Sequence, residues 1–233
     1  MPFHPQDDAA GAACDMAIKK AKMATQEVSR METVKDVETL ERLYGVPGKS
    51  SVLKEVDHLH PAYRPLIERS PFMVLATSGP GGLDASPRGD PAGFVVIEDA
   101  HTLLLPDRRG NNRMDSLRNI LADPRVALLF FVPGVNETLR VNGRASIVIE
   151  PSMLERFIHE GKTPRSVLRI TVETVYFQCS RALVRSGLWD PARHIPRSEF
   201  PSPGSILEAL SPESFNASEY DRELPGRVKT TLY

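Results

Sequence analysis

The feature that most constrains the fold is a run of short apolar segments between residues 72 and 149, separated by stretches typical of turns. One such turn is SGPGG at 78–82, and a single helical pattern, near residues 112–123, interrupts the series. A doubly wound parallel sheet needs a helix after nearly every strand, so this spacing favours an antiparallel barrel or sheet. We therefore predict a mainly β fold of the α+β type with peripheral helices. The segments are FMVLAT (72–77), LDASPRGDPAGFVVIED (83–99), TLLLP (102–106), RVALLFFV (125–132) and ETLRVNGRASIVI (137–149).

Composition narrows the class of protein. With 233 residues, 41% of them hydrophobic and 25% charged, the chain can build one sizeable core. The net charge of −1 gives no general attraction to nucleic acid or to an anionic membrane. Cys14 and Cys179 have neither the spacing of a disulfide framework nor that of a zinc site, and Cys179 is expected to be a buried small residue. We expect a protein of the reducing cytoplasm.

The ends of the chain differ in character from its middle. Residues 1–32 lack the apolar core of a secretory signal and are predicted to be a flexible extension. No segment approaches the roughly 20 apolar residues of a membrane span, so no membrane partner is expected. Residues 196–233 are rich in Pro and Ser, with one brief helical patch at 205–210, and are predicted to be an arm wrapping the barrel.

Residues 33–70 are predicted to form a helical cap that precedes a barrel domain at 71–195. Thr33 is a candidate cap for a first helix, and SVLKEVDHL (51–59) is a candidate second helix. His58 and His60 have no third ligand nearby, so we interpret them as surface or structural residues and predict no metal site. The first helix is indicated by apolar residues at helical spacing, namely Val34, Val37, Leu40 and Leu43.

The stretch LPDRRGNNRMDSLRNILAD (105–123) predicts an anion site. Asn112 is a candidate N-cap, and Arg108, Arg109 and Arg113 flank the expected helix terminus. Because uncapped backbone N–H groups and the helix dipole both favour negative charge there, a phosphate would be stabilised. The same arginines could instead pair with surface carboxylates. The apolar stripe of the helix is predicted to be Met114, Leu117, Ile120 and Leu121.

Nucleic acid is not expected as a partner of these arginines, because Asp107, Asp115 and Asp123 interleave with them and break up the basic surface that such binding needs.

Three runs together carry a family resemblance: ASPRGDPAGFV (85–95), TLLLPDRRGNNRMDSLRNILADPRVALLFFVPG (102–134) and ETLRVNGRA (137–145). They resemble the FMN-binding split barrel of the pyridoxamine 5′-phosphate oxidase superfamily, in a branch of FMN-dependent enzymes, over roughly residues 33 to 190. The resemblance implies an antiparallel split barrel whose basic loop and preceding strand bind the FMN phosphate, with the strand end beside the flavin ring or ribityl chain. The residues implicated here are Arg88, Asp90, Pro106, Asp107, Arg108, Asn111, Asn112, Arg113 and Ser116.

The resemblance also implies a homodimer with sites at the subunit interface. Thr138 and Arg140 would complete the site from the polar face of a strand, although they could equally be ordinary outward positions. Trp189 would lie near the flavin, with core packing as the alternative. The chain departs from true pyridoxamine 5′-phosphate oxidases in its RGDPAGFV segment, in its longer loop and in lacking their C-terminal basic residues. Synthesis of pyridoxal phosphate is therefore not implied.

The function expected from the resemblance is that of an FMN-dependent oxidoreductase, with hydride transfer through flavin N5. The substrate would be a small molecule, and NADPH or NADH would supply electrons. Flavin chemistry needs no dedicated catalytic pair, and the sequence shows no G-x-S-x-G or H-E-x-x-H motif, so no catalytic residue is assigned. The alternative is a non-catalytic FMN- or haem-binding protein, a sensor or carrier.

Overall fold

The computed structural model describes residues 32–211 and 215–233, and the chain divides into two compact units, Met1–Gly48 and Lys49–Tyr233. The extension predicted over residues 1–32 lies outside the described residues apart from Glu32. In the first unit, helix α2 (Val37–Tyr44) begins after Asp36, whose side chain accepts a hydrogen bond from the Thr39 backbone N–H at 2.7 Å. Thr33 is therefore not the cap, and none of the residues of α2 is buried.

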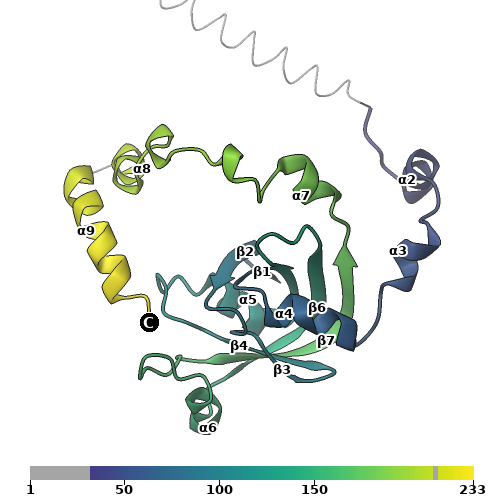
Figure 1. Cartoon of the computed structure of the whole chain (residues 1–233), viewed down its shortest axis with the longest axis horizontal. Coiled ribbons are helices and arrows are strands. Elements are labelled where there is room, and N and C mark those ends of the chain that lie inside the picture. The colour runs from purple at the N-terminus through teal and green to yellow at the C-terminus, as the bar shows by residue number, and fades with distance from the viewer. Residues whose placement is uncertain (1–31, 212–214) are drawn as a thin grey trace, which may run out of the picture. The chain divides into compact units, whose positions relative to one another are not determined.

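The second unit is built on one seven-stranded sheet, in the order β2-β1-β5-β6-β7-β4-β3, with every neighbouring pair antiparallel. The predicted antiparallel, mainly β fold is confirmed. Figure 1 shows the sheet with its surrounding helices. The strands are β1 (Phe72–Gly79), β2 (Gly82–Gly89), β3 (Val96–Asp99), β4 (Thr102–Pro106), β5 (Arg125–Phe131), β6 (Thr138–Val148) and β7 (Val167–Gln178). The α-helices are α3 (Lys49–Leu53), α4 (Arg64–Glu68), α5 (Asp115–Ala122), α6 (Pro151–Glu155), α7 (Arg181–Ser186), α8 (Pro203–Leu210) and α9 (Ala217–Thr230), and the short 3₁₀ helices are η1 (Pro61–Tyr63), η2 (Pro191–Arg193) and η3 (Arg197–Glu199).

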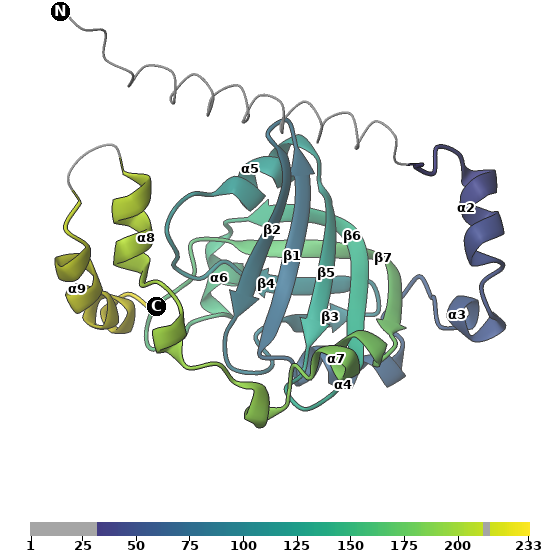
Figure 2. The same ribbon diagram turned by 90° about the horizontal axis from the view of Figure 1, so that it is seen from above.

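The sheet curls over on itself, so that β2, β1 and β5 lie across from β4 and β3 (Figure 2). Apolar side chains from both halves belong to one buried cluster, to which Leu75 of β1, Leu128 of β5, Leu105 of β4 and Ile170 of β7 contribute. Each of these side chains is at most 1% exposed. One continuous core therefore fills the interior of a partly open barrel.

A β-bulge between Asn142 and Gly143 supports this curvature, since the register of β6 with β7 shifts at that point. Gly143 approaches the partner strand so closely that a Cβ atom there would collide with the backbone oxygen of Thr171. Only glycine fits this position without moving the backbone. The long strands β6 and β7 can thus bend and serve both halves of the barrel.

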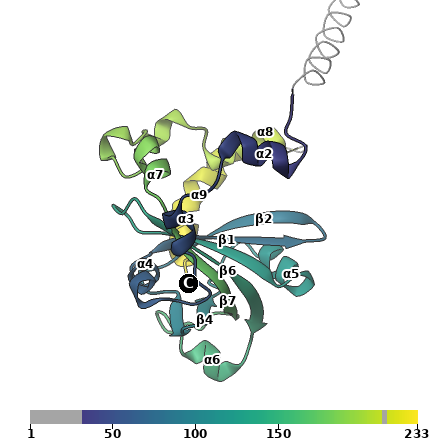
Figure 3. The same ribbon diagram turned by 90° about the vertical axis from the view of Figure 1, so that its right-hand side faces the viewer.

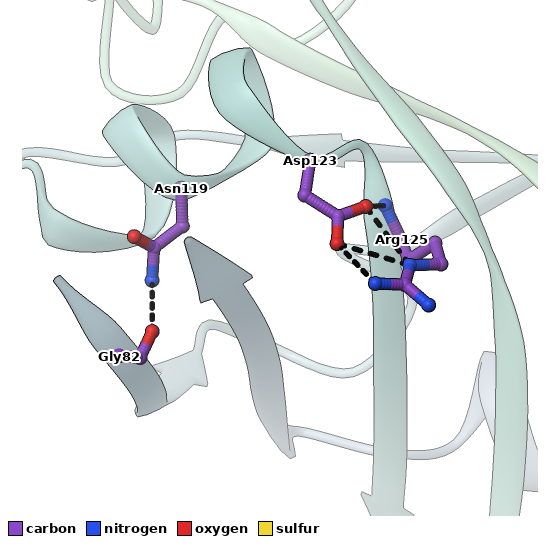
Figure 4. A network of polar contacts seen from close by, with 4 residues as sticks. All are labelled: Gly82, Asn119, Asp123 and Arg125. Atoms are coloured by element: carbon purple, nitrogen blue, oxygen red, sulfur yellow. Dashed lines mark hydrogen bonds and ion pairs between the residues drawn. The ribbon is translucent and has the colours of Figure 1, made fainter. Parts of the chain in front are cut away.

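Helix α5 packs against β1, β2 and β6 at one end of the barrel (Figure 3). Its buried residue Asn119 donates from Nδ2 to the Thr77 hydroxyl at 3.2 Å and makes a longer contact of 3.5 Å with the Gly82 carbonyl oxygen. At the end of the helix, the Asp123 carboxylate accepts hydrogen bonds from the backbone N–H and the guanidinium of Arg125 (Figure 4). Polar contacts therefore fix the middle and the C-terminal end of α5 to the sheet.

The start and the apolar face of α5 differ from the prediction. The helix begins at Asp115, and its N-cap is Met114, which has a left-handed backbone (φ 61°) and makes no capping hydrogen bond. Asn112 also has a positive φ, of 60°, so it belongs to the preceding turn and is not the cap. Leu121 is 77% exposed, because the helix rests on the sheet mainly through Ile120, with Leu117 half-buried beside the core.

Several further expectations were wrong or incomplete. The segment 83–99 forms two strands, since the chain turns away from the sheet after Gly89 and pairs again as β3. The predicted second cap helix is shorter, ending at Leu53. In the arm, a second helix, α9, follows the expected helical patch, although Pro225 lies inside it. Cys179 was expected to be buried and is exposed. Strand β7 was not predicted, although its alternation of buried and exposed residues is clear from Leu168 to Val172.

Within the part of the chain that is described, no helix combines the length and the apolar character needed to cross a bilayer.

Candidate functional site

A cleft of about 650 Å³ lies between β2, the loop that follows β4, and the first turn of α5. Most of the residues that line it have polar or charged side chains. The residues that line it are Asp84–Arg88, Asp107–Leu117, Arg165 and Ser166.

Strand β2 supplies one wall through its alternation. Asp84, Ser86 and Arg88 are half-buried, whereas Ala85 and Pro87 between them are exposed. Because side chains along a strand alternate between its two faces, every second residue of β2 projects on the cleft side. The sequence DASPR therefore places a carboxylate, a hydroxyl and a guanidinium along one edge of the site.

Two ion pairs hold the loop that follows β4. Arg88 Nη1 donates to Asp107 Oδ1 at 2.7 Å, and Arg108 Nε donates to Asp90 Oδ2 at 2.7 Å. Arg108 also donates from Nη1 to the carbonyl oxygen of Phe157, at 2.7 Å. All these side chains are at most 21% exposed, so solvent screens the pairs less than it screens surface pairs. Arg108 therefore stabilises the position of the loop through its bonds to Asp90 and Phe157.

The helix side of the cleft is tied to β2. Ser116, which is only 4% exposed, donates from its hydroxyl to Asp84 Oδ2 at 2.6 Å. Arg113 Nε donates to Asp115 Oδ2 at 2.8 Å, and this hydrogen bond raises the pKa of the Arg113 guanidinium. The Arg113 side chain is 76% exposed, so it can reorient toward a ligand at little cost.

Positive charge exceeds negative charge in the lining, which contains five arginines and three aspartates. Arg88 Nε is buried and has no hydrogen-bond partner among the described residues. Arg109 is exposed and makes no ion pair within the same residues. A buried nitrogen donor without a partner is costly, so it indicates a place where an acceptor would be stabilised.

The structure brings most of the residues predicted for the cofactor site together and leaves others outside. Asp90 and Pro106 adjoin the cleft, Asp90 through its pair with Arg108 and Pro106 as the buried last residue of β4. Those that line the cleft are Arg88, Asp107, Arg108, Asn111, Asn112, Arg113 and Ser116.

Three other predicted residues neither line nor adjoin this cleft. Thr138 is buried at the start of β6, and Arg140 donates to the Tyr176 hydroxyl at 2.7 Å on the outer face of the sheet. Trp189 lies beyond α7 and donates from Nε1 to the carbonyl oxygen of Val135, at 2.9 Å.

Sequence reasoning missed several lining residues. Asp84 and Ser86 could have been predicted from Arg88, because alternate residues of one strand project from the same face. No local pattern in the sequence marks Arg165 as a site residue. It lies at the site because β4 pairs with β7, with Pro106 opposite Val167. Its Nη1 donates to Asn112 Oδ1 at 3.0 Å.

Several proteins of known structure are similar to part of this chain. HupZ from Group A Streptococcus is 18% identical, with a TM-score of 0.41 over 50% of this chain and 90% of its own. General Stress Protein 26 from Bacillus anthracis is 17% identical, with a TM-score of 0.38 over 49% of this chain and 88% of its own. An FAD-binding protein from Mesorhizobium loti is 16% identical, with a TM-score of 0.36 over 51% and 93%. No curated protein matches the chain.

The sequence pattern of one family, described as pyridoxamine 5′-phosphate oxidase, matches residues 59–179. The match includes all seven strands of the sheet and every residue that lines the cleft. It spans more than half of the 233 residues, and the chain therefore belongs to the pyridoxamine 5′-phosphate oxidase family.

Proposed function

We propose that this protein is an FMN-dependent oxidoreductase that holds the FMN phosphate in the cleft between β2 and α5. The observation that carries the proposal is the buried Nε of Arg88, which has no hydrogen-bond partner in the described part of the chain and lies in a cleft with more arginines than aspartates. A dianionic phosphate offers the acceptor that this donor lacks. Membership of a family of flavin-dependent oxidases supports the same ligand.

The cleft fits such a group in size and in donors. Ligand pockets commonly measure about 300–1,000 Å³, and this cleft measures about 650 Å³. The hydroxyl of Ser86 and the guanidinium groups of Arg109 and Arg113 line the same space as Arg88. The first turn of α5 also faces the cleft and has no side-chain cap, so its backbone N–H groups can donate to an anion.

Several residues of the cleft have distinct roles in this proposal. Asp107 orients Arg88 through their ion pair, and Asp84 holds Ser116 and so keeps the helix terminus against β2. Arg113 turns from Asp115 to the phosphate. When bound, the flavin supplies hydride transfer through N5, which requires no catalytic acid or base from the protein. We propose a small-molecule substrate and NADPH or NADH as the electron donor, in the cytoplasm.

We further propose a homodimer with sites at the subunit interface. The outer face of β1 and β5 presents apolar side chains to solvent: Phe72 is 41% exposed, and Val74, Leu129 and Phe131 are half-buried. Arg140 borders this face, because it lies opposite Leu129 on the neighbouring strand β6. An apolar sheet face with a polar rim is typical of a subunit interface.

The test is the absorption spectrum of the purified protein, followed by reconstitution with FMN and anaerobic mixing with NADPH or NADH. Bound flavin that bleaches with either nucleotide is the expected result. Bound flavin that neither nucleotide bleaches would favour the non-catalytic carrier or sensor. A haem spectrum, or no affinity for FMN, would contradict the proposal.

A further inference from the structure

Tyr233, which follows α9, packs against the loop that follows β4 and lines the cleft. Its hydroxyl donates to Asp90 Oδ1 at 2.6 Å, across 143 positions of sequence. Its ring centroid lies 4.1 Å from that of His159 and 5.8 Å from the guanidinium carbon of Arg108. Lys162 Nζ donates to the Tyr233 backbone oxygen at 2.9 Å. Side-chain and backbone contacts together hold Tyr233 at this position.

The buried carboxylate of Asp90 accepts hydrogen bonds from two side chains. Its side chain is 2% exposed, with Oδ1 accepting from Tyr233 and Oδ2 accepting from Arg108 Nε. A buried carboxylate needs its hydrogen bonds, because water cannot replace a donor that is lost. Loss of the Tyr233 hydroxyl would therefore leave one oxygen of Asp90 without its donor and allow the carboxylate to shift.

A shift of Asp90 would reach the phosphate-binding residues through the loop. Arg108 is bound to Asp90, and its chain neighbour Asp107 is bound to Arg88. The path runs from the Tyr233 hydroxyl to the buried, unpartnered Nε of Arg88 through two ion pairs and one peptide link. Arg109, an exposed arginine that lines the cleft, is the next residue of the same loop.

We infer that Tyr233 is a positioning residue for the anion site: its hydroxyl fixes Asp90 and Arg108 and thereby the loop that carries Arg109 and that, through Asp107, orients Arg88 of β2 toward a phosphate. The ligand named here rests on the proposed function, whereas the effect on the loop does not. Tyr233 also lines a smaller cleft of about 220 Å³ that shares Asp107, Arg108, Arg109 and Arg165 with the larger one. The segment after α9 therefore helps to position the residues of the site.

The first experiment compares Tyr233→Phe with wild type in fluorescence titrations with FMN and with riboflavin, which lacks the phosphate. The affinity ratio of FMN to riboflavin is expected to fall roughly three- to tenfold. Tyr220→Phe is the matched control, because Tyr220 lies on α9 and its ring contacts Phe215 and Arg227, away from the cleft. Tyr233→Ala, which also removes the ring, should lower the ratio further.

The second experiment needs no flavin. Tryptic cleavage after Arg109 in the ligand-free protein should be faster in Tyr233→Phe than in wild type and unchanged in Tyr220→Phe, because the loop is less firmly held. If wild type does not bind FMN, the proposed ligand is wrong and this cleavage rate alone decides the role of Tyr233. Equal losses for FMN and riboflavin with a lowered melting temperature, or an unchanged cleavage rate, would overturn the inference.

Discussion

Arg88 of β2 and Asp107, the residue after β4, form an ion pair of 2.7 Å, although β2 and β4 are not neighbours in the sheet. Arg88 belongs to β2, one edge of the sheet, and Asp107 directly follows β4, the strand next to the opposite edge. The sheet curls until these two regions meet, and the cleft opens where they meet. The ion pair therefore closes the barrel at the same place where the anion site is built.

Replacing Arg88 or Arg113 with Ala should weaken FMN binding. Each variant removes a charge-assisted hydrogen bond to the phosphate worth about 1.5–3 kcal/mol, which corresponds to a loss of roughly ten- to a hundredfold in affinity. Fluorescence titration measures this loss as the ratio of FMN to riboflavin affinity. Arg118→Ala is the control, because Arg118 is exposed on α5 and does not line the cleft. A ratio unchanged in both variants would mean that these arginines do not hold the phosphate.

Gly79 and Asn119 should be energetically coupled. A Cβ atom at Gly79 would collide with Asn119 Oδ1 and lie 2.8 Å from its Cγ, so Gly79→Ala should force Asn119 out of place and destabilise the protein by roughly 1–3 kcal/mol. Asn119→Ala should be destabilising as well, because Thr77 loses its partner.

In the double variant, part of the cost of Gly79→Ala should disappear, because the colliding side chain is gone. The rescue should be incomplete, since the Cα of Asn119 would still be 3.0 Å from the added methyl group. Urea unfolding of the four proteins gives the coupling free energy, and strict additivity would contradict the predicted collision.

Asp123 should contribute to stability in mildly acidic solution and lose that contribution in strong acid. Hydrogen bonds from Arg125 lower the pKa of Asp123 from 3.8 to about 2 in the folded protein (Figure 4). A carboxyl group whose pKa is lowered by folding stabilises the folded state above its unfolded pKa, and this stabilisation is lost as the pH falls through the folded value.

Asp123→Asn should therefore be less stable than wild type above pH 3.8, and the two curves of unfolding free energy against pH should converge toward pH 2. Arg125→Gln removes the same interaction and should show the same convergence. A constant difference between Asp123→Asn and wild type across this range would exclude the ion pair as its source.

Placing a charge on the apolar outer face of β5 should separate the proposed dimer. Leu129→Glu puts a carboxylate among Phe72, Val74 and Phe131, so sedimentation should show a folded monomer where wild type is a dimer. Ser146→Glu on the exposed part of β6 is the matched control. A flavin-loaded monomer in the wild type would rule out a site that needs two subunits.

The strands were largely predictable from the sequence because their pattern is local. The segments 72–77, 102–106 and 125–132 coincide closely with β1, β4 and β5, each bounded by turn residues. The start of α5 was not predicted, because Met114 takes a left-handed conformation that its residue type does not favour. Asn112 has the composition of a cap, but the loop uses it in a turn, where its side chain accepts from Arg165.

The predicted anion site depended on one contiguous stretch of sequence, and the rest of the cleft comes from long-range pairing. Ser166 lies in it because its carbonyl oxygen accepts from the Asp107 backbone N–H at 2.9 Å. The contact of Tyr233 with Asp90 likewise joins residues that no sequence period relates. Contacts of this kind depend on how the sheet closes. The periodicity of apolar residues in the sequence does not specify that closure.

The order of the strands also bears on the kinetics of folding. The hairpins β1–β2 and β3–β4 join strands that follow each other in sequence. In contrast, β4 pairs with β7, with Thr102 opposite Thr171, and the chain between them contains α5, β5, β6 and α6. Closing long loops costs entropy before any contact compensates for it, so the pairing of β4 with β7 is expected to form late. The two walls of the cleft would then meet only after the transition state for folding. An anion that bridges them should slow unfolding much more than it speeds folding.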